Sequence, residues 1–354
     1  MKAIINDRYG PIDDLRAKDI DRPAIGDSEV LVRVRAAGLH IGDIYGVRGA
    51  PYLMRLATGL RRPKYGVPGF DVAGVVEAVG PGVTRYKVGD EVFGVTDGSA
   101  AEFARATEEG LAHKPARLTF EEAAAIPTSA IAALQGLRDA GKLRSGQRVL
   151  VVGASGGVGT FAVQIAKAFG ADVTGVTSTR NVELVRSIGA DHVVDYTTED
   201  FAANGPQYDL ILDNIENRSL SDVRRALRPG GTLVLNSGTG ASGLRMLVRL
   251  VRPVILSLFS RQSLRRFLSH PTAADLAFLA TLASEGRLRP VVGATYPLKE
   301  TPTALQHIAA GHARGKVVVA VSVPSSAQAA ATSAPCRARN SRRQRTVAST
   351  ALNV

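Results

Sequence analysis

A glycine-rich turn between an apolar strand and an amphipathic helix is the part of the chain best suited to chemistry. Residues 148–152 read as a strand, the sequence GASGGVG follows, and residues 157–169 read as a helix. Glycines let the backbone turn tightly and approach a pyrophosphate, and the helix N-terminus offers unpaired N–H groups to the anion. Because the turn lies inside a βαβ unit, it favours a dinucleotide site over a simple packing turn. The residues predicted to form this site are Ala154, Ser155, Gly156, Gly157, Val158 and Gly159.

The residues after the next strand, predicted at 172–176, indicate which dinucleotide binds. An NAD site usually places Asp or Glu about 20 residues beyond the glycines, where it accepts hydrogen bonds from the ribose hydroxyls. This sequence has no acid there, and Ser178 and Arg180 instead offer a hydroxyl and a guanidinium suited to a 2′-phosphate. The pattern favours NADPH over NADH. Arg180 as an ordinary solvated residue at a helix start stays an open alternative.

Two kinds of element must position these residues. From residue 146 onward, short apolar strands alternate with amphipathic helices, which predicts a doubly wound parallel sheet with helices on both faces. The strands are expected at 148–152, 172–176, 192–195, 208–212 and 232–235, and the helices at 157–169, 181–188 and 220–227.

The first 115 residues are instead rich in glycine and short β segments. Strands are expected at 30–36, 72–79 and 91–95, which predicts a compact β-barrel, and an Ala-rich helix follows Thr119. A last strand at 317–323 could return to this domain. The predicted organisation is a catalytic domain from 1–125 with 292–323, a nucleotide domain from 126–291, and a disordered basic tail from 324–354.

Composition narrows the class of protein. A chain of 354 residues with 45% hydrophobic residues can bury two cores, and its single cysteine excludes a disulfide framework. Eleven of the twelve net positive charges lie in two acid-free segments, 241–270 and 324–354, so no nucleic-acid partner is expected for the nearly neutral remainder. The amino terminus has no signal-peptide pattern and no apolar run reaches the length of a membrane span. A cytoplasmic location is the expectation.

With these residues in hand, the chain resembles the medium-chain dehydrogenase/reductase superfamily, and within it the zinc-independent quinone oxidoreductase branch, over residues 1–323. The resemblance implies an α/β fold with a GroES-like β-barrel catalytic domain and a Rossmann doubly wound parallel-sheet domain. The motifs that carry it are GLH at 38–40 with Asp43 and Tyr45, PGFDVAG at 68–74, GDEVFG at 89–94, the turn at 154–159, and GHARGK at 311–316.

The family comparison also bears on zinc. In zinc-dependent members a Cys and a His hold the metal, and those places look like His40 and Phe70 here. Phenylalanine cannot ligate zinc, and His40 with Asp71 lacks the three protein ligands of a catalytic site. The sequence therefore predicts no metal site, and the reduction of a quinone or an α,β-unsaturated carbonyl compound with NADPH. An alcohol dehydrogenase, or a non-catalytic NADPH-binding regulatory protein, stays open as an alternative.

The resemblance implies roles for three residues near the substrate. Tyr45 would bind the substrate carbonyl or relay a proton, His40 would donate to the substrate oxygen, and Asp43 would orient its neighbours. Each has a plainer alternative: a Tyr with its hydroxyl bound to backbone, a structural His, and an Asp with no catalytic part.

Further cofactor contacts are implied in the same way. Thr128 matches the threonine near the nicotinamide or simply caps a helix, and Tyr196 resembles the tyrosine beside the 2′-phosphate. Asn236 and Ser237 end a strand at the carboxyl edge of the sheet, where such folds bind ligands. Lys316 resembles a lysine near the cofactor, or is a charge at a strand edge.

The apolar and basic segment 246–268 is expected to form two helical pieces. Three interpretations are open: a dimer or lid face, a membrane-surface amphipathic segment, and an RNA-binding patch. The first is favoured because helices packed by an apolar face need no other partner. A second such stretch, 52–64, is expected to form a substrate lid. The expected partners are thus a small carbonyl or quinone substrate and a second copy of the chain in a homodimer.

Overall fold

The computed structural model describes residues 1–50, 52, 55–64, 66–236, 257, 260–311 and 313–321. Within that part of the chain, a six-stranded parallel sheet has the strand order β10-β9-β8-β11-β12-β13. Numbered by position in the chain from β8 onward, this is the order 3-2-1-4-5-6 of dinucleotide-binding sheets. The strands are β8 (Arg148–Val152), β9 (Asp172–Thr177), β10 (His192–Asp195), β11 (Tyr208–Asp213), β12 (Leu227–Leu235) and β13 (Ser263–Arg266).

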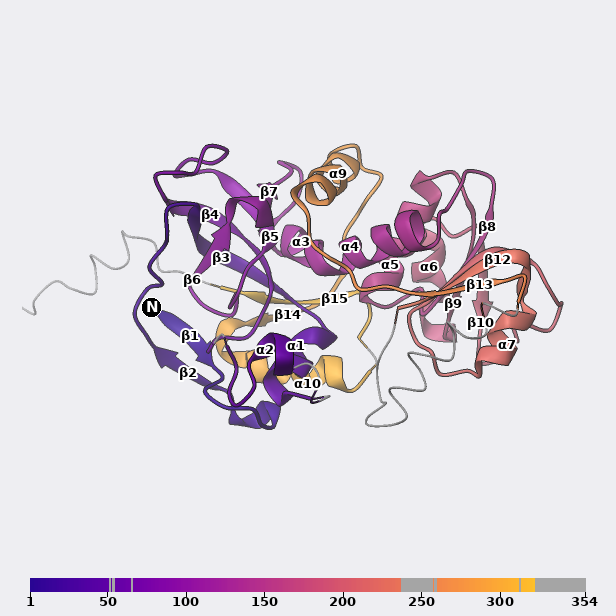
Figure 1. Cartoon of the computed structure of the whole chain (residues 1–354), viewed down its shortest axis with the longest axis horizontal. Helices are drawn as coiled ribbons and strands as arrows, with labels where there is room; N and C mark the ends of the chain where they lie inside the picture. Colours follow the sequence, from indigo (N-terminus) through magenta and orange to yellow (C-terminus); the bar gives the residue numbers. More distant parts are fainter. Residues whose placement is uncertain are drawn as a thin grey trace, which may run out of the picture. The chain divides into compact units, whose positions relative to one another are not determined.

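Helices cover both faces of this sheet, because successive side chains of a strand point to opposite faces. Val149 and Val151 belong to one apolar core with α4 (Pro127–Gln135), α5 (Gly157–Ala168), α6 (Val182–Ser187) and α9 (Ala273–Ser284). Leu150 and Val152 belong to a second core, which includes Val223 of α7 (Leu220–Arg225). The helices can be followed around the sheet in Figure 1. The doubly wound parallel sheet expected from the sequence is confirmed.

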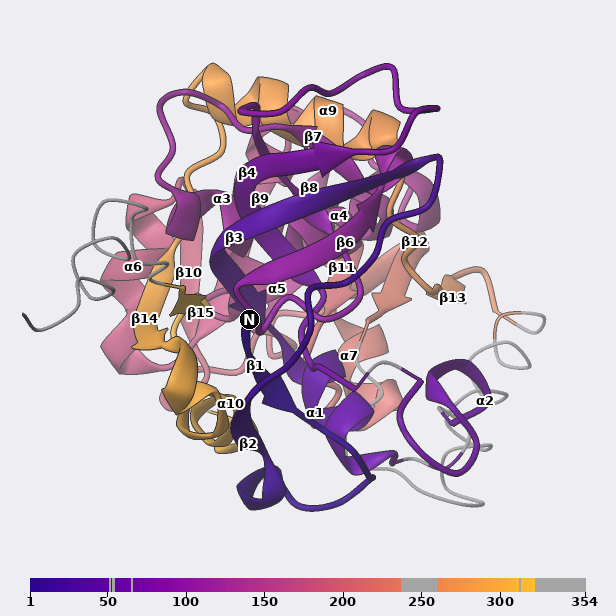
Figure 2. The same cartoon turned by 90° about the vertical axis from the view of Figure 1, so that its left-hand side faces the viewer.

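A seven-stranded sheet contains most of the amino-terminal strands and the last two strands described. Its order is β14-β15-β3-β4-β5-β7, and β6 pairs with β3; Figure 2 shows β3, β4, β6 and β7. Strand β15 pairs antiparallel with β3, so the chain returns to this sheet after the parallel sheet is complete. The strands are β3 (Glu29–Leu39), β4 (Asp71–Val79), β5 (Glu91–Val95), β6 (Phe103–Thr107), β7 (Leu111–His113), β14 (Val292–Pro297) and β15 (Lys316–Ala320).

Short elements connect and flank the two sheets. A separate antiparallel pair is formed by β1 (Lys2–Ile5) and β2 (Arg16–Asp19). Helix α3 begins after Thr119, whose hydroxyl accepts a hydrogen bond from the Glu122 N–H, while the Glu122 side chain accepts one from the Thr119 N–H. None of the helices in the described ranges is long and apolar enough to cross a membrane. The remaining helices are α1 (Ile41–Arg48), α2 (Arg55–Thr58), α3 (Phe120–Ala125) and α10 (Thr301–Ala309), with single turns at Ile12–Asp14, Glu108–Gly110, Gly136–Ala140, Thr179–Asn181 and Leu298–Glu300.

The prediction of helices across 246–268 is wrong for residues 260–268, the continuous part of this segment that the structure describes. Residues 263–266 form β13, which pairs in parallel with β12 and places Leu264 opposite Leu233. Leu264 is buried in the second core of the sheet, and this burial explains why the segment extends the sheet instead of coiling into a helix. Residues 237–256, 258 and 259 lie outside the described residues, so the lid, dimer, membrane and RNA interpretations stay predictions.

Candidate active site and cofactor cleft

A cleft of about 440 Å³, open to solvent, lies at the carboxyl ends of β8, β9 and β11. This is the edge at which open parallel sheets bind ligands, beside the point where the strand order reverses. No acidic residue is among those that line it. Five of the predicted cofactor residues do line it: Ser155, Gly156, Ser178, Arg180 and Tyr196.

The glycine turn fits a dinucleotide closely. Gly153 has a φ of 76°, a left-handed conformation that glycine adopts without strain. A Cβ added to Gly159 would lie 2.0 Å from the Gly153 carbonyl oxygen, so a side chain cannot be placed there. Helix α5 begins at Gly157 with no side-chain cap on its first N–H groups, which leaves them for an anion.

Ala154 is fully buried, and its contacts attach the glycine turn to strand β9. Its N–H donates to the Val176 carbonyl oxygen (3.0 Å), and its side chain packs against Gly175. Gly157, Val158 and Gly159 form the first turn of α5 beside the cleft.

The Ser155 hydroxyl is held by two neighbours. It accepts hydrogen bonds from the Thr177 hydroxyl (2.8 Å) and from the Asn181 amide (3.2 Å), and both of these residues also line the cleft. Neither residue was predicted from the sequence, although Thr177 ends β9 and Asn181 lies four residues beyond it, after a strand whose carboxyl end faces the predicted site.

Basic and aromatic side chains also line the cleft. Arg180 is exposed and has no ion-pair partner among the described residues, and Tyr196 is 56% exposed. A second arginine, Arg218, also lines the cleft; it forms an ion pair with Asp200, and its guanidinium lies 4.5 Å from the Phe201 ring centroid. Arg218 was not predicted, although its place just after β11, at the carboxyl edge, is the available signal.

Thr128 and Lys316 meet at a buried carboxylate that the sequence analysis did not assign to the cofactor site. Asp71 Oδ2 is 3.1 Å from Lys316 Nζ, and Asp71 Oδ1 accepts hydrogen bonds from the Thr128 N–H (3.0 Å) and hydroxyl. Lys316 Nζ also donates to Ser129 Oγ (3.1 Å). Lys316 is the first residue of β15, and its side chain is 2% exposed.

Asn236, predicted to contact the cofactor at the end of β12, is not among the residues that line the cleft. The Asn236 N–H donates to the Asp213 carbonyl oxygen (2.9 Å), and its side-chain amide donates to Asn214 Oδ1 (2.8 Å). Ser237 lies outside the described residues.

His40 caps helix α1 and leaves one ring nitrogen unused. Its Nδ1 accepts a hydrogen bond from the Gly42 N–H (3.0 Å), and the ring stacks on Phe70 with centroids 5.7 Å apart. Because Nδ1 is an acceptor, the neutral ring carries its proton on Nε2. That Nε2 is buried and has no hydrogen-bond partner among the described residues. His40 thus caps α1 through Nδ1, and its Nε2 is a donor without a partner among the described residues.

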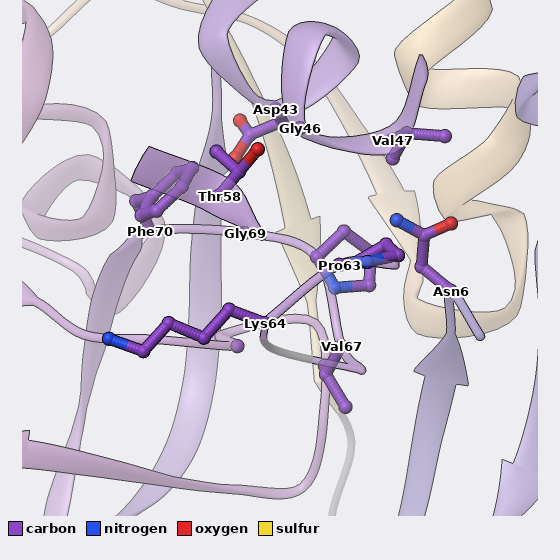
Figure 3. Close-up of a pocket in the computed structure, with 12 residues that line it drawn as sticks. Asn6, Asp43, Gly46, Val47, Thr58, Pro63, Lys64, Val67, Gly69 and Phe70 are labelled. Carbon is purple, nitrogen blue, oxygen red and sulfur yellow. The ribbon is translucent and has the colours of Figure 1, made fainter. Parts of the chain in front are cut away.

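Asp43 completes the N-terminal capping box of α1. Its Oδ2 accepts a hydrogen bond from the His40 backbone N–H (2.7 Å), while Oδ1 is buried without a partner in the described part of the chain. Burial raises the pKa of the Asp43 carboxyl, and the neighbouring His40 offsets part of that rise. Figure 3 shows Asp43 with Phe70 and the other residues that line a small pocket beneath α1.

Tyr45 follows Asp43 by two residues in α1 and is half-buried. Burial raises the pKa of the Tyr45 hydroxyl, so it is protonated at neutral pH. The hydroxyl has no hydrogen bond to any described residue, in contrast to the alternative in which backbone binds it.

The described residues include no group of three or more His, Cys, Asp or Glu side chains that could hold a metal ion. Phe70 occupies the position at which zinc-dependent members have a zinc-binding histidine, and its ring stacks on that of His40. The zinc-free reaction stays a prediction, to be tested by metal analysis.

The 3-2-1-4-5-6 sheet, its glycine turn and the second, mostly antiparallel sheet together define a two-domain nucleotide-dependent oxidoreductase fold. Residues 26–135 match the model of the alcohol dehydrogenase GroES-like domain, and residues 188–319 match that of the zinc-binding dehydrogenases. The chain belongs to the quinone oxidoreductase branch of the medium-chain dehydrogenase/reductase superfamily. The predicted family and fold class are confirmed.

Three relatives illustrate this membership. The mitochondrial NAD(P)H oxidoreductase RTN4IP1 of Danio rerio is 35% identical, with 91% of each chain covered. The 2-methylene-furan-3-one reductase of Solanum lycopersicum is 32% identical over 90% of this chain and 79% of its own. The quinone oxidoreductase of Coxiella burnetii has a similar structure, with a TM-score of 0.79, 28% identity, and 91% and 99% of the two chains covered. An NAD(P)H-dependent oxidoreductase activity follows for this chain.

Proposed function

We propose that this chain is a zinc-independent, NADPH-dependent reductase that transfers hydride to a quinone or an α,β-unsaturated carbonyl compound. The observation that carries the proposal is the buried, unpartnered Nε2 of His40, stacked beside Phe70. A donor at that place can stabilise the negative charge that develops on a substrate oxygen, which a metal ion does in zinc-dependent members.

The cleft residues fit NADPH in the following way. The free N–H groups at the start of α5 would hold the pyrophosphate, and Ser178, Arg180 and Arg218 would bind the 2′-phosphate. Tyr196 would lie against the adenosine end. When bound, the dihydronicotinamide supplies the hydride.

Residues of the chain would then stabilise the substrate carbonyl oxygen and supply the proton. The His40 Nε2–H would donate to the substrate carbonyl oxygen, and Tyr45, which is protonated at neutral pH, would donate a second hydrogen bond or the proton. Asp43 would hold the His40 backbone and so fix the direction of the ring. The similarity of the chain to an NAD(P)H oxidoreductase, a 2-methylene-furan-3-one reductase and a quinone oxidoreductase supports this substrate class.

The test follows NADPH consumption by the full chain with a panel of quinones and enones. We expect turnover with at least one class and no oxidation of simple alcohols by NADP⁺. His40→Ser keeps a helix cap but removes the Nε2 donor, and should lower kcat by roughly 10- to 100-fold with NADPH affinity unchanged. Tight NADPH binding without turnover on any acceptor would instead favour a non-catalytic NADPH-binding protein.

A further inference from the structure

We propose that Asp71 is a positioning residue for the cofactor: it keeps Lys316 charged and Thr128 in place beside the glycine turn without itself touching NADPH. This inference rests on the proposed binding of NADPH in the cleft. Asp71 lies in β4, Thr128 in α4 and Lys316 at the start of β15, so one carboxylate joins elements from three distant parts of the chain.

Both oxygens of Asp71 are used. Oδ1 accepts the N–H and the hydroxyl of Thr128, and Oδ2 accepts from the Lys316 ammonium at 3.1 Å. The side chains of Asp71 and Lys316 are 0% and 2% exposed, so this is a fully buried ion pair. Burying an ion pair is costly unless the hydrogen bonds of its charged groups are also made. The hydrogen bonds of the Asp71 carboxylate are made here.

Asp71 also provides the N-terminal cap that α4 otherwise lacks. The residue before the helix, Ile126, has no side chain that can cap it, and Pro127 occupies the first helical position. The Thr128 N–H, one of the donors left free at a helix start, donates to Asp71 instead. A carboxylate at this end is favoured by the helix dipole, so Asp71 sets the position of the Thr128 hydroxyl.

Lys316 lies against the anion-binding turn. Gly315 donates its N–H to the Ser155 carbonyl oxygen (2.8 Å) and forms a bridge with Gly156. A Cβ built on Gly157 would be 3.3 Å from Lys316 Cδ, so the lysine stem runs alongside the first residue of α5. The positive charge of Lys316 is therefore carried on a stem that lies beside the first residue of α5, whose free N–H groups would hold a phosphate.

The charge at this place depends on Asp71. Without the carboxylate, burial favours the neutral amine of Lys316, and the fraction of protein that carries the ammonium would fall as the pH rises. Two other groups face this cluster: Ser129, which is neutral, and Asp43, which interacts electrostatically with both members of the pair. Asp43 accepts no hydrogen bond from Lys316, so it cannot replace Asp71 as the acceptor for the ammonium.

The experiment measures the NADPH dissociation constant of the full chain from about pH 6 to about pH 9, a range in which a lysine deprived of its partner can titrate. We expect Asp71→Asn to bind NADPH increasingly poorly as the pH rises, by roughly tenfold relative to the wild type at the alkaline end. Lys316→Met should bind weakly at every pH, and Asp71→Glu should restore the wild-type profile. Lys114→Met is the matched control: Lys114 is 4% exposed and lies 3.1 Å from Glu91 in an ion pair remote from the glycine turn, so its loss should leave NADPH binding unchanged.

The double variant Asp71→Asn/Lys316→Met keeps the test decisive if Asp71→Asn alone does not fold, because it leaves no unpaired buried charge. The proposal predicts that its affinity equals that of Lys316→Met. Wild-type affinity in the double variant, or a wild-type pH profile in Asp71→Asn, would show that the pair is only structural and overturn the inference. A wild-type chain that binds no NADPH would overturn the proposed function instead.

Discussion

Substitution of Arg180 is the most direct test of whether the cleft prefers NADPH to NADH. The side chain is exposed at the turn after β9, lines the cleft, and has no carboxylate partner among the described residues. A 2′-phosphate is the only part of NADPH that NADH lacks, so a contact to it must appear as a difference between the two cofactors. Arg180→Ala should therefore weaken the binding of NADPH and leave that of NADH nearly unchanged.

The magnitude follows from the kind of contact. A hydrogen bond between charged groups contributes about 1.5–3 kcal/mol, which corresponds to roughly 10- to 150-fold in affinity. Solvent screens an exposed guanidinium, so the loss should fall near the lower end, roughly tenfold. The same screening predicts that added salt narrows the difference between wild type and variant.

The assay is a fluorescence titration of each cofactor into wild type, Arg180→Ala and a control. Arg186→Ala is the matched control, because Arg186 is also an exposed arginine and lies in the following helix, where it forms an ion pair with Glu183 at 2.7 Å. It should change neither affinity. Equal losses of NADPH and NADH affinity in Arg180→Ala would refute the 2′-phosphate assignment, and a loss confined to Arg218→Ala would move the assignment to that residue.

Three further predictions concern the site and its surroundings. Because burial raises the pKa of Asp43 in the folded chain, its carboxyl contributes stability at low pH that is lost as the pH rises through that pKa; urea unfolding should show Asp43→Asn gaining stability relative to wild type toward neutral pH. Gly159→Ala should abolish NADPH binding and lower Tm, because its Cβ would meet the Gly153 carbonyl oxygen at 2.0 Å, whereas Gly46→Ala, with open space around it, should not. Elemental analysis should find well under one zinc per chain, and a full equivalent would overturn the interpretation of Phe70.

The parallel sheet could be predicted in detail because its signals are local. Strands 148–152 and 192–195 were predicted at the bounds that the structure gives, since each has consecutive β-branched or apolar residues between polar or glycine-containing turns. The glycine turn lay in the same stretch of sequence, so the cleft could be placed before the fold was known. The ends of longer strands were less accurate: β12 begins at Leu227, five residues before its predicted start, because Arg228, Pro229 and two glycines hide it.

Strand β13 shows where local patterns fail. Its sequence, SLRR, has one apolar residue among polar and basic ones, and it lies in a longer stretch that suggested a helix. What makes it a strand is the edge of β12, which accepts it in parallel and buries Leu264. Such an edge exists only after the rest of the sheet has formed, and periodicity within the segment cannot report it.

The same limit applies to charged residues in the site, with a larger consequence for function. The motif that contains Asp71 and the motif that contains Lys316 were both recognised in the sequence. Each residue was interpreted from its own motif, without reference to the other. The structure joins them over a separation of 245 residues, so the charge of one depends on the other. A buried lysine is an anion-binding group only while a carboxylate keeps it charged. The proposed role of Lys316 toward NADPH is therefore a property of the pair, and the proposal makes it depend on Asp71, to which sequence alone assigned no cofactor role.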